Sequence, residues 1–246
     1  MRHFASILAV LAALAAAGPA HAAPRQSVKL LDCETALGQT ARSAVFEGRM
    51  RSVAGAQRLL MRFSLQARRP GGGRWRGVPA PGLGRWVSSD RGVARYVYTK
   101  RVENLVAPAG YRALVSFRWL DADGRRVLSA RETSPVCAQP DLRADLRALS
   151  MDIQAAADPG QASYAVLLVN HGRAVSDAFA LALTVDGQPL APQRVEALEP
   201  GERRTVTVTG PICRPGATLT VDLDLNGEVD ERSEADNRLT RSCPAR

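Results

Sequence analysis

The sequence predicts an all-β protein, built from two tandem antiparallel β-sandwiches that follow a cleaved signal peptide. Three observations support this. Apolar and polar residues alternate in many short segments, as they do in half-buried strands. Turn-forming pairs such as Asp186-Gly187 and Asn226-Gly227 follow several of these segments, and the first half shows no convincing helix. All four cysteines lie beyond the signal, an even number that is typical of exported proteins with disulfides.

Residues 1–22 read as a signal peptide. Arg2 and His3 precede an apolar run over residues 4–17, and Ala20-His21-Ala22 has the small residues of a cleavage site. The run is shorter than the roughly 20 strongly apolar residues that a stable membrane span needs. We therefore expect an exported protein without a transmembrane segment, located outside the cell or in the cell envelope. A retained N-terminal anchor is the alternative.

The rest of the chain is long enough for two domains of ordinary size. We place a basic β-sandwich at residues 27–137, a linker at residues 138–141 and a second β-sandwich at residues 142–243. Pro140 interrupts strand pairing and marks the linker.

Alternation is clearest in the first domain over residues 57–67 and 111–119. The residues expected to face inward there are Leu59, Met61, Phe63, Leu65, Ala67, Tyr111, Ala113, Val115, Phe117 and Trp119. Further strands are expected at residues 28–31, 43–50, 93–102 and 127–131, the last after a turn at residues 121–124. Leu105, Pro108 and Tyr111 have a spacing similar to the tyrosine corner of immunoglobulin-like and fibronectin-like sandwiches.

Residues 68–92 are the least regular part of this domain, and they set two tryptophans among arginines. Arginine beside exposed tryptophan suits contact with an anionic polymer or a membrane interface. The alternative is structural: the two indoles fold back over the open edge of the core. The candidate contact residues are Arg68, Arg69, Arg74, Trp75, Arg76, Arg85 and Trp86.

Charge divides the chain in two. Residues 24–139 contain 21 basic and 8 acidic residues, a net charge of +13, whereas residues 140–246 contain 11 and 16, a net charge of −5. An anionic partner would therefore meet the first domain. Composition is the competing explanation, because Lys29 and Lys100 are the only lysines and an arginine-rich, GC-rich genome would give the same bias.

Three pairings of the four cysteines are possible, and their positions favour one of them. Cys33 and Cys137 bracket the strands of the first domain, while Cys213 and Cys243 bracket the last hairpin.

That hairpin is expected to begin with a strand over residues 218–225. Asn226-Gly227 would form a type I′ turn, the chain would return through Val229, and Cys213 would face Thr240. The same stretch matches the first half of an EF-hand loop, with Asp222, Asp224, Asn226 and Asp230 as calcium candidates. However, Ser233 stands where the loop needs a bidentate glutamate, and alternation already explains the acids as a solvated strand face. We therefore predict no metal and no cofactor.

The segment EVDERSEADN at residues 228–237 resembles the closing motif of CARDB, the "cell adhesion related domain found in bacteria". In that motif a valine and two glutamates precede an asparagine pair, represented here by Val229, Glu231, Glu234 and Asp236-Asn237. Three upstream segments are similar to the start, a hairpin and a turn of the family: Pro140-Asp141-Leu142, Asn170-His171-Gly172 and Leu198-Glu199-Pro200-Gly201. The resemblance implies an immunoglobulin-type sandwich with a recognition, adhesion or spacer role.

Catalytic candidates are few. His171 is the only histidine left after signal cleavage, it lies at an expected turn, and no phosphate-binding loop is present. Carboxylate-only hydrolysis is the remote alternative. The sequence predicts a non-catalytic binding, adhesion or spacer protein. The alternative is an accessory protein whose basic first domain binds an anionic cell-surface polymer. The expected partner is a protein or an anionic polysaccharide of the envelope, not a nucleic acid.

Overall fold

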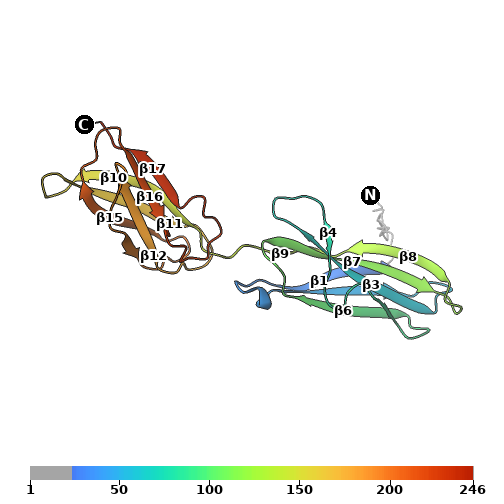
Figure 1. Ribbon diagram of the computed structural model, residues 1–246. Helices are drawn as coiled ribbons and strands as arrows, with labels where there is room; N and C mark the ends of the chain where they lie inside the picture. Colours follow the sequence, from blue (N-terminus) through green and yellow to red (C-terminus); the bar gives the residue numbers. More distant parts are fainter. Residues whose placement is uncertain (1–23, 246) are drawn as a thin grey trace, which may run out of the picture.

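The computed structural model describes residues 24–245, and these residues form 17 strands and one short 3-10 helix at Gln39–Ala41. The strands fall into two groups that lie end to end along the chain (Figure 1). We call β1 to β9 the first sandwich and β10 to β17 the second sandwich. The predicted all-β class is confirmed. The expected signal peptide, residues 1–22, lies outside the described residues.

The first sandwich packs a three-stranded sheet against a six-stranded sheet, with antiparallel pairing throughout. The three-stranded sheet has the order β1-β2-β6: β1 (Gln26–Glu34), β2 (Ser43–Arg51) and β6 (Arg95–Glu103). The centre of the other sheet is formed by β3 (Arg58–Arg68), β7 (Ala109–Leu120) and β8 (Arg126–Thr133). Three short strands extend it: β4 (Arg76–Val78) and β5 (Trp86–Ser88) pair with β3, and β9 (Cys137–Gln139) pairs with β7.

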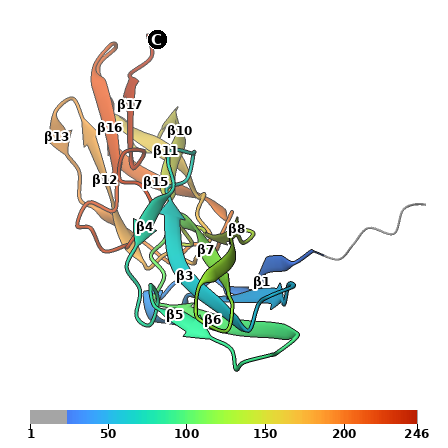
Figure 2. The same cartoon turned by 90° about the vertical axis from the view of Figure 1, so that its right-hand side faces the viewer.

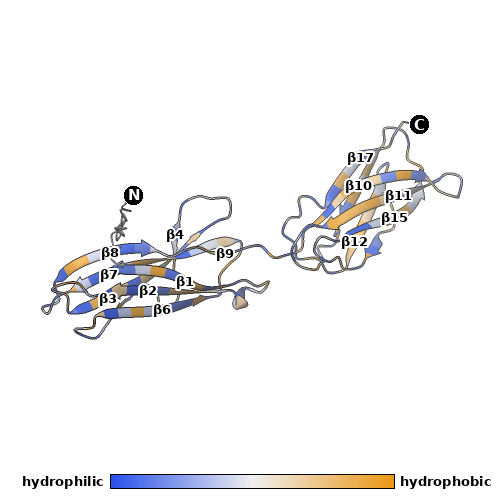
Figure 3. Ribbon diagram, turned by 180° about the vertical axis from the view of Figure 1, so that it is seen from behind, coloured by the Kyte–Doolittle hydropathy of each residue, from blue (hydrophilic) through white to orange (hydrophobic). Residues whose placement is uncertain are grey.

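Alternation places the apolar side chains of β3 and β7 between these two sheets, and hydrophobic and hydrophilic residues alternate along the strands in Figure 3. Nine of the ten predicted inward residues are buried, and Ala67 is partly buried at the margin of the same cluster. The tyrosine corner is also confirmed. The Tyr111 hydroxyl donates to the carbonyl oxygen of Val106 at 2.8 Å and accepts from its N–H at 3.0 Å.

Two expectations for this part of the chain need correction. Residues 68–92 contain strands β4 and β5, which lie beside β3 (Figure 2). They were missed because three residues are too few to show alternation. The expected linker is shorter by two residues, because Ala138 and Gln139 in β9 pair with Gly110 and Ala109. The irregular connection therefore begins at Pro140, which has no N–H to donate to a ladder.

The second sandwich also has two antiparallel sheets. One has the order β10-β11-β15: β10 (Leu146–Ala155), β11 (Gln161–Asn170) and β15 (Arg203–Pro211). The other is built on β12 (Phe179–Val185), β16 (Thr218–Leu223) and β17 (Arg238–Ser242), with the short strands β13 (Gln188–Pro189) and β14 (Gln193–Val195) paired with β12. The core of this sandwich is a cluster of its own, with Leu146, Tyr164, Phe179 and Leu219 fully buried.

The expected hairpin at Asn170-His171-Gly172 is wrong, because β11 and β12 belong to different sheets. The Asn170 amide instead supports a crossing between the sheets: its Oδ1 accepts from Gly172 N–H at 2.9 Å and from Asp145 N–H at 3.2 Å. A Cβ on Gly172 would lie 2.5 Å from the backbone of Ala144. Only glycine fits this close approach.

The closing hairpin exists, but its predicted turn is wrong. β16 ends at Leu223 and β17 begins at Arg238, and Thr220 pairs with Thr240. Asn226 lacks the positive φ of a type I′ turn, while Asp224 has a φ of 50°. The Asp224 carboxylate accepts the N–H groups of Glu228 and Val229, and Val229 is buried in the core. Burial of Val229 and these backbone bonds therefore favour a long inward-folded loop over a tight turn.

Two disulfides join Cys33 to Cys137 and Cys213 to Cys243, with Cα–Cα distances of 5.4 and 6.0 Å. Among residues 24–245 no helix has the length and apolar composition needed to cross a bilayer.

Candidate functional site

The outer face of the six-stranded sheet carries an aromatic ring between basic side chains. The guanidinium carbon of Arg118 lies 4.1 Å from the centre of the Trp86 ring, and that of Arg62 lies 4.9 Å from it. Both distances are within the range of cation-π contacts. Trp86 is half-buried. The arginines come from the central strands β3 and β7, and the indole comes from the short strand β5.

A second group of the same kind lies on the same sheet. The guanidinium carbons of Arg112 and Arg68 lie 4.2 and 4.7 Å from the centre of the Trp75 ring. Arg112 Nε also donates to Gln66 Oε1 at 2.9 Å, which holds the guanidinium in place. Trp75 and Trp86 therefore each contact one arginine of β3 and one arginine of β7.

Strand alternation explains why these side chains share one face. Met61, Phe63 and Phe117 face the core, so their neighbours Arg62 and Arg118 face outward. The register then sets the neighbours: Arg62 pairs with Trp86 on one side and with Ser116 on the other. We call this surface the arginine-tryptophan face. It comprises Arg62, Arg68, Trp75, Trp86, Arg112, Arg118, Arg126 and Arg131.

The surface is hollowed beside Trp86. A pocket of about 430 Å³ is lined by Arg62, Trp86, Arg118, Arg126 and Arg131 together with serines of β7 and β8. Another pocket of about 430 Å³ lies at the margin of the same sheet, where Ala67 and Val78 pack against the core, and its basic lining residues are Arg68, Arg69, Arg74 and Arg76. Among the described residues, neither pocket is lined by an aspartate or a glutamate.

The arginines of this face lack anionic partners within residues 24–245. None of its six arginines takes part in an ion pair there, whereas ten other arginines do. The Nε of Arg62 is buried and donates no hydrogen bond within the same residues.

Stacking prepares these guanidiniums for anion binding. A guanidinium over an indole carries its N–H donors at its edges, where they can form paired bonds to a carboxylate, sulfate or phosphate. Contact with the ring also limits the motion of a long side chain, so less entropy is lost on binding. The face therefore presents several guanidiniums close together.

The sequence found part of this face and missed the rest. Trp75 and Trp86 lie on it, Arg68 stacks on Trp75, and Arg69, Arg74 and Arg76 line the second pocket. Arg85 is exposed and lines neither pocket. The missed residues are Arg62, Arg112, Arg118, Arg126 and Arg131. The alternation of β3 and β7 identified several of them as outward, but it did not place them beside the indoles.

The structure does not bring the four calcium candidates together. Asp222 pairs with Arg238, and Asp230 pairs with Arg143 at 3.0 Å. Only Asp224 belongs to an acidic group among the described residues, together with Glu231 and Glu234. The EF-hand spacing does not produce a calcium loop here, because β16 continues through Asp222 and keeps that side chain on the outer face of the strand.

That acidic group already supports the loop between β16 and β17. Both Asp224 oxygens accept backbone N–H groups, and the Asn237 amide donates to Glu231 and Glu234. Burial raises the pKa of Glu231, and the nearby carboxylates of Glu234 and Asp224 raise it further. The cluster therefore acts as a structural clamp for the loop.

His171, the single histidine among residues 24–245, is an exposed residue of the second sandwich. Its Nδ1 lies 3.7 Å from the buried carboxylate of Asp145, which also pairs with Arg147 at 2.9 Å and Arg232 at 2.6 Å. These arginines tie β10 to the loop before β17. The geometry thus explains Asp145 as the centre of a structural ion-pair network.

Comparison with known proteins places a recognised module in the second half of the chain. Residues 139–241 match the model of the CARDB family, which confirms the resemblance seen in the closing motif. No curated protein matches the chain significantly. The CARDB match supports an adhesion-type protein of the cell surface.

Solved structures show distant similarity. One domain of a candidate cell surface protein from Methanosarcina acetivorans is 25% identical, and the alignment covers 42% of this chain and 93% of that one with a TM-score of 0.38. A bacterial adhesin from Mobiluncus mulieris is 9% identical over 89% of this chain and 92% of that one, with a TM-score of 0.30. Red sea bream transglutaminase is 11% identical over 90% of this chain but 31% of that one, with a TM-score of 0.30.

Proposed function

We propose that this chain is an exported, non-catalytic protein of the cell surface that binds an anionic polysaccharide through its arginine-tryptophan face. In this proposal residues 27–137 form the binding domain, and residues 142–243 form a CARDB domain that acts as an adhesion module or spacer. The observation that carries the proposal is that four guanidiniums lie over two indoles on one sheet face, beside a pocket that has no acidic lining residue among the described residues.

Charge distribution supports a binding role for the first sandwich. The net charge is +13 over residues 24–139 and −5 over residues 140–246, so an anionic polymer is attracted to one end of the molecule and repelled by the other. A compositional bias toward arginine explains the number of arginines. It does not explain why four of these arginines lie over Trp75 and Trp86.

A polymer fits the face better than a single small ligand does. Stacked arginines occur at two separate places on the sheet, around Trp75 and around Trp86, and the Trp86 group lines a pocket. A repeating anionic chain can contact both groups at once, and two linked contacts bind far more tightly than one. The flat indole faces can also pack against sugar rings between the charges.

The experiment measures binding of the mature chain to dextran sulfate, polygalacturonate and uncharged dextran. We expect binding to both anionic polymers, none to dextran, and a steep loss of binding between about 50 and 300 mM salt, as electrostatic contacts become screened. The double variant Arg62→Gln, Arg118→Gln should bind at least tenfold more weakly.

The matched control is Arg203→Gln, Arg241→Gln, which removes the same charge from exposed arginines of the second sandwich. It should bind as the parent protein does. An equal loss of polymer affinity in both variants would show that only net charge matters and would overturn the proposal. Affinity that does not change with salt concentration would also overturn it.

A further inference from the structure

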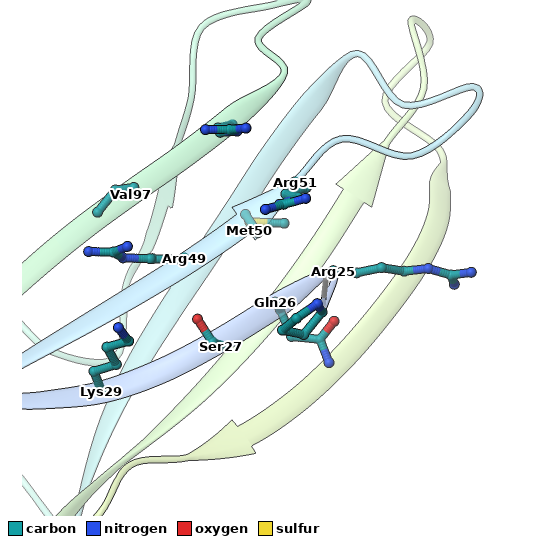
Figure 4. Close-up of a pocket in the computed structure, with 10 residues that line it drawn as sticks. Arg25, Gln26, Ser27, Lys29, Arg49, Met50, Arg51 and Val97 are labelled. Carbon is teal, nitrogen blue, oxygen red and sulfur yellow. The ribbon is translucent and has the colours of Figure 1, made fainter. Parts of the chain in front are cut away.

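The three-stranded sheet of the first sandwich carries a further basic pocket. A pocket of about 410 Å³ lies on its outer face, near the start of β1 (Figure 4). Its lining contains five basic residues and, within the described part of the chain, no acidic one: Arg25, Lys29, Arg49, Arg51 and Arg95. The arginine-tryptophan face lies on the opposite sheet, and the two sets of lining residues do not overlap.

Strand register brings these cations together. Arg51 of β2 pairs directly with Arg95 of β6, and the Arg51 N–H donates to the carbonyl oxygen of Arg25 at 2.8 Å. One row further along the sheet, Arg49 pairs with Ser27 on one side and with Val97 on the other. Rows on one strand face lie roughly 7 Å apart and neighbouring strands roughly 5 Å apart, so Arg49, Arg51 and Arg95 lie within the reach of one small ligand.

The direct pairing of Arg51 and Arg95 is unfavourable by itself. Like charges opposite each other on antiparallel strands destabilise the pair. Neither residue forms an ion pair within residues 24–245, whereas neighbouring Arg49 is paired with Glu47. The fold therefore keeps two uncompensated guanidiniums side by side where an anion would relieve their repulsion.

The pocket also offers groups that are not charged. Ser27 and Gln26 contribute polar side chains, and Val97, which is 49% exposed, forms an apolar wall beside Arg49. Figure 4 shows Ser27, Lys29, Arg49 and Val97 around the same opening. A bare inorganic anion would use the cations alone, whereas a ligand with a carbon body and hydroxyl groups would use the whole lining.

We propose that this pocket is a separate site for the sulfate or phosphate ester group of a sugar, with Arg51 and Arg95 binding the ester oxygens. Paired guanidiniums match the geometry of a tetrahedral oxyanion. The sugar ring would lie against Val97, within hydrogen-bonding reach of the polar residues of β1. The first sandwich would then bind anions on both of its outer faces.

Isothermal titration of the mature chain with glucose 6-phosphate, glucose 6-sulfate, inorganic phosphate and glucose tests the site. We expect both esters to bind more tightly than inorganic phosphate, and glucose not to bind. The ratio of the two ester affinities identifies which oxyanion is preferred. The double variant Arg51→Gln, Arg95→Gln should lose at least tenfold in affinity for the preferred ester.

Two variants separate this site from the proposed function. Arg62→Gln, Arg118→Gln on the arginine-tryptophan face and Arg203→Gln, Arg241→Gln in the second sandwich should leave ester binding unchanged. In turn, loss of polymer binding in the face variant would leave the pocket result intact. Without ligand, the pocket variant should melt at the same or a higher temperature, because a like-charge pair has been removed.

Three results would overturn the proposal. They are no ester binding by the parent protein at millimolar concentration, equal binding by the pocket variant, and equal weakening in all three double variants. The last result would show a general charge effect.

Discussion

The side chain of Glu231 joins the loop before β17 to the start of β10. Its Oε2 accepts a hydrogen bond of 2.7 Å from the backbone N–H of Leu146, which is 85 residues away in the sequence. Both residues are buried, and the Asn237 amide donates to the other carboxylate oxygen. The closing motif that resembles CARDB therefore holds together the first strand of the second sandwich and the loop before its last strand, which are far apart in the sequence.

Removal of this carboxylate should destabilise the second sandwich. In Glu231→Ala the N–H of Leu146 loses its partner inside the protein, and we expect a loss of about 2 to 3 kcal/mol in the free energy of unfolding. Glu231→Gln keeps an acceptor for that N–H and should cost less. All three tryptophans lie in the first sandwich, so calorimetry should show the change while the tryptophan fluorescence transition stays in place. A loss of equal size in both variants would contradict this account.

The same residue predicts a pH dependence. Burial is the main cause that raises the pKa of Glu231 above its ordinary value of 4.5, so the folded state favours the protonated form. This contribution to stability is complete below the ordinary pKa and is lost as the pH rises through the folded pKa. The stability of the parent protein relative to Glu231→Gln should therefore be greater at pH 4 than at pH 7. Melting both proteins across this range isolates the effect, because the other carboxylates are common to both.

The tyrosine corner should stabilise the first sandwich by the energy of its hydrogen bonds. Tyr111→Phe removes both bonds to Val106 and leaves a partly buried peptide group with fewer partners, so we expect a loss of about 1 to 2 kcal/mol. Urea unfolding followed by tryptophan fluorescence measures it. Tyr98→Phe is the control, since the Tyr98 hydroxyl forms no hydrogen bond within residues 24–245. Equal effects of the two changes would mean that the corner bonds contribute nothing specific.

The two disulfides should stabilise their sandwiches to different extents. Cys33 and Cys137 are 104 residues apart, and Cys213 and Cys243 are 30 apart. In the chain-entropy description the longer loop contributes about 5 kcal/mol and the shorter one about 4. Replacing Cys33 and Cys137 by alanine should therefore shift the fluorescence transition, and replacing Cys213 and Cys243 should shift only the calorimetric transition of the second sandwich. Reduction of the parent protein should reproduce both shifts.

The indoles of the arginine-tryptophan face should matter more for binding than for folding. Trp75 and Trp86 are half-buried on the outer surface, so alanine at both positions should cost only about 1 to 2 kcal/mol each in stability. Binding to dextran sulfate should fall at least tenfold, and Trp86→Phe should retain part of it because a phenyl face also attracts cations. If the alanine variants unfold the first sandwich, the indoles are structural covers and the alternative reading of residues 68–92 is correct.

Local patterns predicted the strands well and the loops poorly. Residues 57–67 and 111–119 showed their buried faces in the sequence, because a side-chain period of two depends only on neighbouring residues. The tight turn predicted at Asn226-Gly227 was wrong because distant residues decide the path of this loop. The local preference for a tight turn lost to the burial of Val229 and to the Glu231 carboxylate, whose partner Leu146 is set by the tertiary fold.

By itself the sequence determined the all-β class, the strands with clear alternation, the charge difference between the two halves and the two tryptophans among arginines. The tertiary structure decided which arginines those tryptophans meet. Arg62 and Arg118 are 56 positions apart, and only the antiparallel pairing of β3 with β7 and of β3 with β5 places both beside Trp86. Register between distant strands results from packing of the shared core, and a local pattern does not contain that information.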